Sequence, residues 1–268
     1  MLETLIGNFR LFLVVFGRLA ALFEVAPLFS SEAIPQPAKL GFALFVSVMV
    51  LPWVSAAGYP LPAATGQYLL LVAGEVLIGL IMGFFLNLIF AVFQAAGQYF
   101  SLQIGFGASE VFDPLAEIEI PLMGQFLNVV GMFTFLVIAG AQKMVLVGVY
   151  RSFQAVRAVD LVLGRQFLTR ELVAGIGRLF ADALTISFPI LGTLLLVSVA
   201  MGLLAKAAPQ MNLLLMGFPF SIGVAFLIMV LAMPFLVGSI SRIVDGGFEA
   251  LNGLFWGLSA ARRAGGAP

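Results

Sequence analysis

The stretch that decides the fold is residues 68–100, YLLLVAGEVLIGLIMGFFLNLIFAVFQAAGQYF, whose only acidic or basic residue is Glu75. About 20 apolar residues are enough for a helix to cross the hydrocarbon core of a bilayer. A segment that is apolar on every side predicts a helix surrounded by lipid or by other protein. This segment is longer than one crossing needs, so we expect it to tilt, kink or project beyond the lipid.

Further apolar segments lie on both sides of this stretch and give about six in total. They are Leu5–Phe29, Leu40–Ala57, Leu122–Tyr150, Leu172–Ala205 and Met211–Ile240. Pro189, Pro219 and Pro234 lie inside the last two segments and predict kinks, because a proline removes one helical hydrogen bond. The pattern therefore predicts an all-α polytopic membrane protein. The N-terminal segment contains Arg10, Arg18 and Glu24, so we interpret it as the first helix and not as a cleaved leader.

The overall composition supports a membrane location. Of the 268 residues, 62% are hydrophobic and 10% are charged, which is more apolar surface than a soluble core of this length can enclose. The net charge of zero gives no indication of nucleic-acid binding. We expect one membrane-embedded domain over residues 1–261, followed by a short disordered tail at residues 262–268.

The sequence has no cysteine and no histidine. This excludes disulfides, thiolate catalysis and histidine-based metal or haem sites. It also contains neither a phosphate-binding loop nor a nucleophile elbow. We therefore expect no enzyme activity, no metal and no cofactor, and energy for any transport would come from elsewhere.

The placement of charges predicts the orientation in the membrane. The break between the fourth and fifth segments is basic, whereas the break between the third and fourth is acidic. The first contains Arg151, Arg157, Arg165 and Arg170, and the second contains Glu110, Asp113, Glu117 and Glu119. The positive-inside rule then places the basic break and both termini in the cytoplasm.

Several charged residues lie within or at the edges of the apolar segments, where they are costly unless they face protein or water. Those of greatest interest are Arg18, Glu75, Arg178, Asp182 and Lys206. Arg178 and Asp182 are four residues apart and can pair on one helix face. For Arg18 and Glu75, a structural or intersubunit ion pair and a role in transport coupling are both open.

Small residues in the third segment have the spacing of helix-packing motifs. Gly79 and Gly83 form a G-x-x-x-G pattern, and Gly97 continues the series. Such glycines let two helix backbones approach closely in a membrane. The contact is either within the chain or with a helix of a partner.

The segment between the third and fourth apolar blocks combines features that are unusual in a loop. Glycines give it backbone freedom, phenylalanines keep it apolar, and Asp-Pro ends it. The residues concerned are Gly105, Phe106, Gly107, Phe112, Asp113 and Pro114. This pattern indicates either a connector packed against protein or a plug that fills a channel.

The chain contains a series of short motifs whose order and spacing resemble those of the FliR family of flagellar export-gate proteins. They include Arg18 with Ala26-Pro27-Leu28-Phe29, Gly74-Glu75, Gln103-Ile104-Gly105-Phe106, Phe112-Asp113-Pro114, Ala208-Pro209-Gln210-Met211-Asn212 and Gly217-Phe218-Pro219. The likeness covers about Phe9 to Leu236. We also assign Pro209, Asn212 and Gly217 to helix packing. One departure is Ala139-Gly140-Ala141-Gln142, where members of the family often carry Asn-Gly-His.

The resemblance implies a subunit of a type III secretion export gate, in the bacterial inner membrane at the flagellar basal body. It implies kinked helical hairpins, FliP-like and FliQ-like partners in the channel, and FlhB-like and FlhA-like proteins associated with it. Unfolded proteins would be the substrate, and residues 104–121 would form the plug. An injectisome homologue and a small-solute secondary transporter are the alternatives, and Gly217-Phe218-Pro219 favours the flagellar branch.

Overall fold

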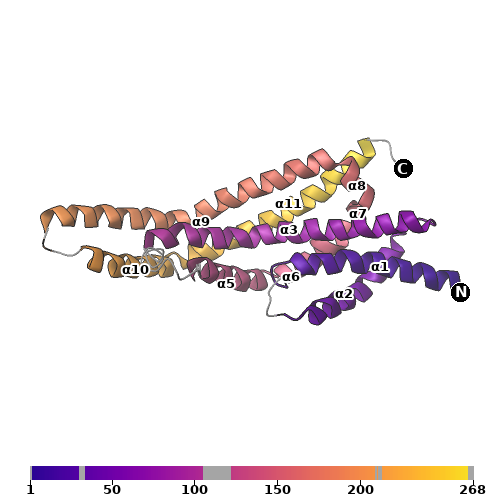
Figure 1. The fold of residues 1–268 in the computed structure, drawn as a ribbon, viewed down its shortest axis with the longest axis horizontal. Helices are drawn as coiled ribbons and strands as arrows, with labels where there is room; N and C mark the ends of the chain where they lie inside the picture. Colours follow the sequence, from indigo (N-terminus) through magenta and orange to yellow (C-terminus); the bar gives the residue numbers. More distant parts are fainter. Residues whose placement is uncertain (1, 30–33, 105–121, 209, 211–212, 265–268) are drawn as a thin grey trace. The chain divides into compact units, whose positions relative to one another are not determined.

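The computed structural model describes residues 2–29, 34–104, 122–208, 210 and 213–264. Every regular element in these ranges is helical (Figure 1). The elements are α1 Leu2–Val25, α2 Gln36–Ala56, α3 Thr65–Ile104, α5 Leu122–Val137, α6 Gly140–Lys143, the π-helix η1 Met144–Tyr150, α7 Arg151–Ala155, α8 Ala158–Leu163, α9 Arg165–Ala207, α10 Leu213–Leu231 and α11 Met233–Ala264. The all-helical prediction is confirmed.

Fewer helices qualify as membrane spans than there are apolar segments. Within the described ranges, three helical stretches are long and apolar enough to cross a bilayer, namely Gln36–Ala56, Thr65–Ser101 and Arg165–Ala207. The number rises to five if each of two bent helix pairs counts as one span. α1 is not among these three stretches of the described residues.

Two helical regions differ from the boundaries that hydropathy gives. The basic break after Tyr150 is not a loop, because it contains α7, α8 and the first turns of α9. The sixth segment, expected to end at Ile240, is divided at Ala232 into α10 and α11, and α11 runs on to Ala264.

The C-terminal half of α11 was missed because it is amphipathic and not uniformly apolar. Its buried positions recur at helical spacing and include Val244, Phe248, Leu251, Phe255 and Leu258. The charged residues between them lower the mean hydropathy of the segment. The helix also extends past residue 261, where the sequence places the start of a disordered tail, and residues 265–268 lie outside the described part.

The chain divides into two compact units. Unit 1 comprises residues 1–89, 139–176 and 244–268, and unit 2 comprises residues 90–138 and 177–243. The division falls within the continuous helices α3, α9 and α11. The expectation of one membrane-embedded domain stays a prediction.

In unit 1, α1 packs closely against α3 through the G-x-x-x-G pattern. A Cβ atom at Gly79 would overlap the backbone carbonyl of Arg18, and one at Gly83 would lie 2.7 Å from the Cβ of Val25. α1 also contacts α2, where the ring of Phe23 packs edge-on against Phe42. The two glycines therefore serve contacts within the chain, one of the two interpretations left open by the sequence.

In unit 2, the second half of α3 packs against α5 in the same manner. A Cβ at Gly97 would overlap the backbone of Gly124, and Gly131 leaves room for the ring of Phe93. Gly217 of α10 is in ordinary contact range of Met201 on α9. Small residues thus set the helix contacts in both units.

Candidate functional site

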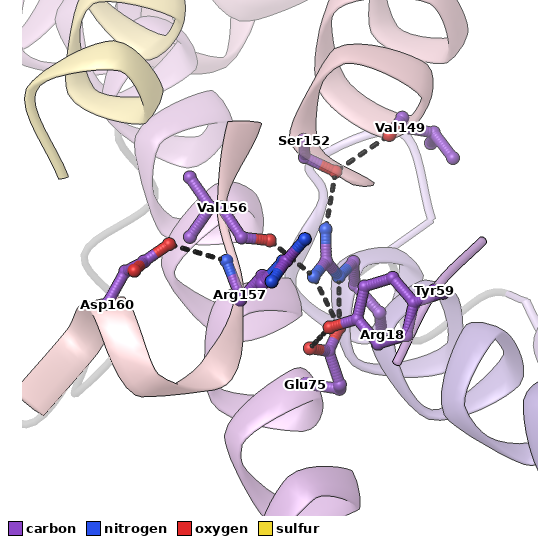
Figure 2. Close-up of polar contacts among 8 residues, drawn as sticks. All are labelled: Arg18, Tyr59, Glu75, Val149, Ser152, Val156, Arg157 and Asp160. Atoms are coloured by element: carbon purple, nitrogen blue, oxygen red, sulfur yellow. Dashed lines mark hydrogen bonds and ion pairs between the residues drawn. The ribbon is translucent and has the colours of Figure 1, made fainter. Parts of the chain in front are cut away.

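Arg18 of α1 and Glu75 of α3 form a fully enclosed ion pair (Figure 2). Both side chains are 0% exposed. Nε of Arg18 donates a hydrogen bond of 2.6 Å to Oε2 of Glu75, and Nη2 lies against the same oxygen. The structure thus brings together two charges that are 57 residues apart in the sequence.

Both terminal nitrogens of the guanidinium also donate hydrogen bonds. Nη1 of Arg18 donates to Oγ of Ser152 at 2.9 Å, and Nη2 donates to the carbonyl oxygen of Val156 at 3.2 Å. The Ser152 hydroxyl donates in turn to the carbonyl of Val149 at 2.7 Å (Figure 2). The guanidinium carbon lies 3.9 Å from the centre of the Phe153 ring, which is a cation–π contact.

The second oxygen of Glu75 is held by a phenol. The hydroxyl of Tyr59, in the segment between α2 and α3, donates to Oε1 of Glu75. Burial raises the pKa of Tyr59, and the nearby Glu75 carboxylate raises it further, whereas Arg18 acts in the opposite direction. Tyr59 therefore remains a neutral donor at physiological pH.

We call Arg18, Glu75, Tyr59, Ser152 and Phe153 the buried cluster. Removing a charged pair from water costs several kcal/mol per ion, and the geometry compensates only when the remaining donors and acceptors are satisfied. Here both carboxylate oxygens and the guanidinium nitrogens have partners. The cluster joins α1, α3, α7 and the segment before α3, so its geometry suits a structural clamp and leaves no open position for a solute or ion.

The sequence identified only the two charged members of this cluster. Tyr59, Ser152 and Phe153 carry no pattern that distinguishes them from other aromatic and hydroxyl residues near apolar segments. Ser152 lies 134 residues from Arg18 in the sequence, so only the folded chain reveals the contact.

The other charged residues singled out by sequence are in different environments. Arg178 is exposed on α9 and interacts electrostatically with the half-buried Asp182 four residues later. Lys206 is exposed in the last turn of α9. Arg18 and Glu75 are therefore buried charges, as the sequence predicts, whereas Arg178 and Lys206 are exposed in the single chain. Long basic side chains can extend away from an apolar helix and keep their charged ends in solvent.

A further ion pair was not predicted. Nζ of Lys143, at the end of α6, pairs with Oδ1 of Asp245 on α11. Their side chains are 36% and 48% exposed, so this is a partly solvated contact within unit 1.

The stretch Ala139-Gly140-Ala141-Gln142, which departs from the family pattern, begins at a residue with a positive φ angle. Ala139, which precedes α6, has φ 58° and ψ 34°. These angles lie in the left-handed region, which residues with a Cβ atom rarely adopt. Glycine and asparagine tolerate this conformation best, so the alanine is a locally strained choice.

The predicted plug residues Gly105, Phe106, Gly107, Phe112, Asp113 and Pro114 lie outside the described residues, as do Pro209 and Asn212. Ile104, the first residue of the predicted plug segment 104–121 and the only one of that segment that the structure describes, is fully buried. Within the described ranges, no group of three or more acidic, histidine or cysteine residues is placed to hold a metal ion.

Comparison with known proteins decides the family. The family model described as "Bacterial export proteins, family 1" matches residues 9–247. The chain belongs to this family. It is 32% identical over 240 residues to the flagellar biosynthetic protein FliR of Borreliella burgdorferi, covering 89% of the chain and 88% of that relative.

Other members of this family are similar over nearly the whole length. The FliR protein of Bacillus subtilis is 29% identical over 256 residues, covering 94% of the chain and 97% of the relative. The FliR protein of Escherichia coli is 26% identical over 219 residues, covering 82% of each chain. The resemblance found in the sequence is confirmed, and the chain belongs to the FliR family of flagellar export proteins.

Proposed function

We propose that the chain is a subunit of the flagellar protein export gate in the bacterial inner membrane, at the flagellar basal body. It would form a channel for unfolded flagellar proteins together with FliP-like and FliQ-like subunits, in association with FlhB-like and FlhA-like proteins. Residues 104–121 would serve as a plug in the resting channel. The flagellar relatives along nearly the whole chain favour this branch over an injectisome homologue.

The observation that carries this proposal is the length and exposure of α9. At 1.5 Å per residue its 43 residues extend about 65 Å, roughly twice the 30 Å hydrocarbon core. Only 11% of its most apolar window is buried within the chain. Lipid alone cannot cover a helix of this length, so other protein subunits would cover much of it.

The polar residues on α9 support the same conclusion. Arg178 and Thr185 are exposed among apolar neighbours such as Phe188, which is 72% exposed. A charged side chain that faces hydrocarbon costs at least about 3 kcal/mol. Helices that carry such groups face protein or water in membrane assemblies, as a channel subunit would.

The plug is supported by composition and position. The segment follows directly on α3, and its Phe106 and Phe112 would exclude water while Gly105 and Gly107 allow displacement by substrate. The turn-forming pair Asp113-Pro114 ends the stretch that is rich in glycine and phenylalanine.

The test combines assembly and conductance. The tagged chain should co-purify with FliP-like and FliQ-like proteins, and deletion of residues 105–113 should raise ion conductance through the reconstituted assembly. Deletion of residues 265–268 is the matched control and should leave conductance at the wild-type level. A chain that purifies alone would overturn the channel, whereas unchanged conductance in an intact assembly would overturn the plug only.

A further inference from the structure

The part of α9 that belongs to unit 2, residues 177–207, is a helix with unlike faces. Its buried side chains recur at helical spacing and are Ala183, Ile186, Ser187, Ile190 and Leu194. The other residues of this part are exposed or half-buried. At 100° per residue the buried positions span only about 100° of the circumference, so much of the helix surface is open to something outside the chain.

One exposed sector of this helix is apolar. Phe180, Leu184 and Phe188 are 54%, 50% and 72% exposed. They lie within about 80° of one another around the helix axis, and we call them the apolar sector. Large apolar side chains that are exposed together suit hydrocarbon or the apolar surface of another subunit.

A second exposed sector of α9 is polar. Arg178 and Thr185 are exposed, and Asp182 is half-buried. These three residues, which we call the polar sector, lie within about 60° of one another and about 130° from the apolar sector. A helix with two open faces of opposite polarity lies between two different surroundings. The polar sector therefore borders water or polar groups.

The main chain of the polar sector also needs a polar neighbour. Pro189 lies inside α9, at an angle between those of Asp182 and Thr185. Because proline has no N–H, the Thr185 carbonyl lacks the donor that a helix normally provides four residues later. A main-chain group without a partner costs several kcal/mol in hydrocarbon. Water at this sector would supply the missing hydrogen bond.

The chemistry of the polar sector suits a moving polypeptide better than a fixed partner. Arg178 has Asp182 as an electrostatic neighbour one turn later, so the two charges balance each other. The Thr185 hydroxyl donates its proton to the carbonyl of Ala181 at 2.9 Å. A fixed partner would gain little from charges that are already balanced, whereas a passing chain needs contacts weak enough to release it.

We propose that the polar sector borders the water-filled path of the channel and contacts the main chain of the polypeptide that passes through it. Arg178 would donate to carbonyl groups of that polypeptide, and Asp182 would accept from its N–H groups. Because every residue carries these main-chain groups, such contacts suit polypeptides of any sequence. The inference rests on the proposed channel function and adds which face of α9 meets the polypeptide.

The experiment uses cysteine crosslinking, for which the chain is suited because it has no cysteine. Thr185→Cys and Leu184→Cys each introduce one thiol, at neighbouring positions about 100° apart around the helix. Each variant is assembled with cysteine-free FliP-like and FliQ-like proteins. An exported polypeptide with cysteines along its extended part and a folded domain at its trailing end is stalled in the channel, and an oxidant is added.

The polypeptide should form a disulfide with the polar sector and not with the apolar sector. Because a disulfide forms only when the two Cα atoms come within about 7 Å, the crosslinked fraction should be roughly tenfold higher for Thr185→Cys than for Leu184→Cys. A water-soluble thiol reagent added before the polypeptide should abolish the crosslink. Arg178→Cys and Phe180→Cys repeat the comparison and decide the question if Thr185→Cys does not assemble.

Equal crosslinking of Thr185→Cys and Leu184→Cys would overturn the proposal. A Thr185→Cys thiol that reacts with the soluble reagent and not with the polypeptide would also overturn it, since the sector would then lie in bulk water. A thiol that reacts with neither would assign the sector to a contact with another subunit. In all three cases an assembly that forms and holds the stalled polypeptide leaves the proposed channel intact, whereas a wild type that does neither overturns both.

Discussion

Arg18 in α1 and Arg178 in α9 both lie in apolar helices, but their surroundings are opposite. Arg18 is fully buried, with a carboxylate, a hydroxyl, a carbonyl and an aromatic ring around it. Arg178 is exposed and has Asp182 one turn away as an electrostatic neighbour. All the groups that enclose Arg18 thus come from unit 1 of the same chain. The surroundings of Arg178, in unit 2, depend instead on what covers the chain.

The difference shows that a charged residue in an apolar helix can have either of two roles. A buried charge whose nitrogens all have partners stabilises one arrangement of helices, and its loss affects folding. An exposed charge on an apolar helix instead marks a surface that another subunit or water covers. The predictions below separate the two cases by stability of the isolated chain.

The largest effect is expected for Arg18→Ala. The substitution leaves the buried Glu75 carboxyl group without its partner, and breaking a buried pair in this way costs about 3–5 kcal/mol. The free energy of unfolding, measured by denaturant titration in detergent, should fall by this amount, or the variant should fail to accumulate. Arg178→Ala, its matched control, should change the free energy by no more than about 0.5 kcal/mol.

A double variant separates the effect of losing the ion partner from the effect of losing side-chain volume. Arg18→Met/Glu75→Leu removes both charges and should recover much of the stability lost in Arg18→Ala, since no unpaired ion remains. Equal losses in Arg18→Ala and Arg178→Ala would remove the distinction between the two arginines.

The next largest effect is expected for Tyr59→Phe. It removes the hydroxyl that donates to Oε1 of Glu75, and a hydrogen bond to a charged group contributes about 1.5–3 kcal/mol. Thermal unfolding at neutral pH should occur at a lower temperature than in the wild type. Tyr150→Phe, which keeps the ring that packs on Trp53, is the comparison and should cost less.

The same variant should alter the pH dependence of stability. Because burial raises the pKa of Tyr59 in the folded state, the folded chain holds this proton more tightly than the unfolded chain. The contribution is complete below the unfolded pKa of about 10 and is lost as the pH rises above it. The wild type should therefore lose more stability than Tyr59→Phe between neutral pH and strongly alkaline pH; identical alkaline slopes would contradict the buried environment.

The smallest effect is expected for Gly79→Ala. The added Cβ would overlap the Arg18 carbonyl and approach Ala21, forcing α1 and α3 apart beside the buried cluster. Overpacking costs about 1–3 kcal/mol, partly offset by the helix propensity of alanine, so a net loss of about 1–2 kcal/mol is expected.

Gly41→Ala provides the control for this change. No atom lies within 4 Å of a Cβ at Gly41 on α2, so only the propensity gain of up to about 1 kcal/mol remains. The two variants should change the unfolding free energy in opposite directions. A stabilising Gly79→Ala would mean that α1 and α3 do not approach as closely as their contacts indicate.

The sequence by itself determined the helical class and the family. Apolar stretches of this length satisfy their backbone groups in a membrane only as helices, so the composition of residues 68–100 is sufficient to assign them to a helix. The cost of a buried charge likewise pointed to Arg18 and Glu75, and the spacing of Gly79 and Gly83 pointed to a close helix contact. These inferences rest on local composition, which the sequence displays directly.

Only the tertiary structure decided which charges are enclosed and by what. Tyr59, Ser152 and Val156 join Arg18 and Glu75 from distant segments, and no local pattern marks them. Hydropathy also ended the last segment too early, because one face of α11 is buried and the other is charged. Burial depends on neighbours brought together by folding, and the average polarity of a segment does not contain that information.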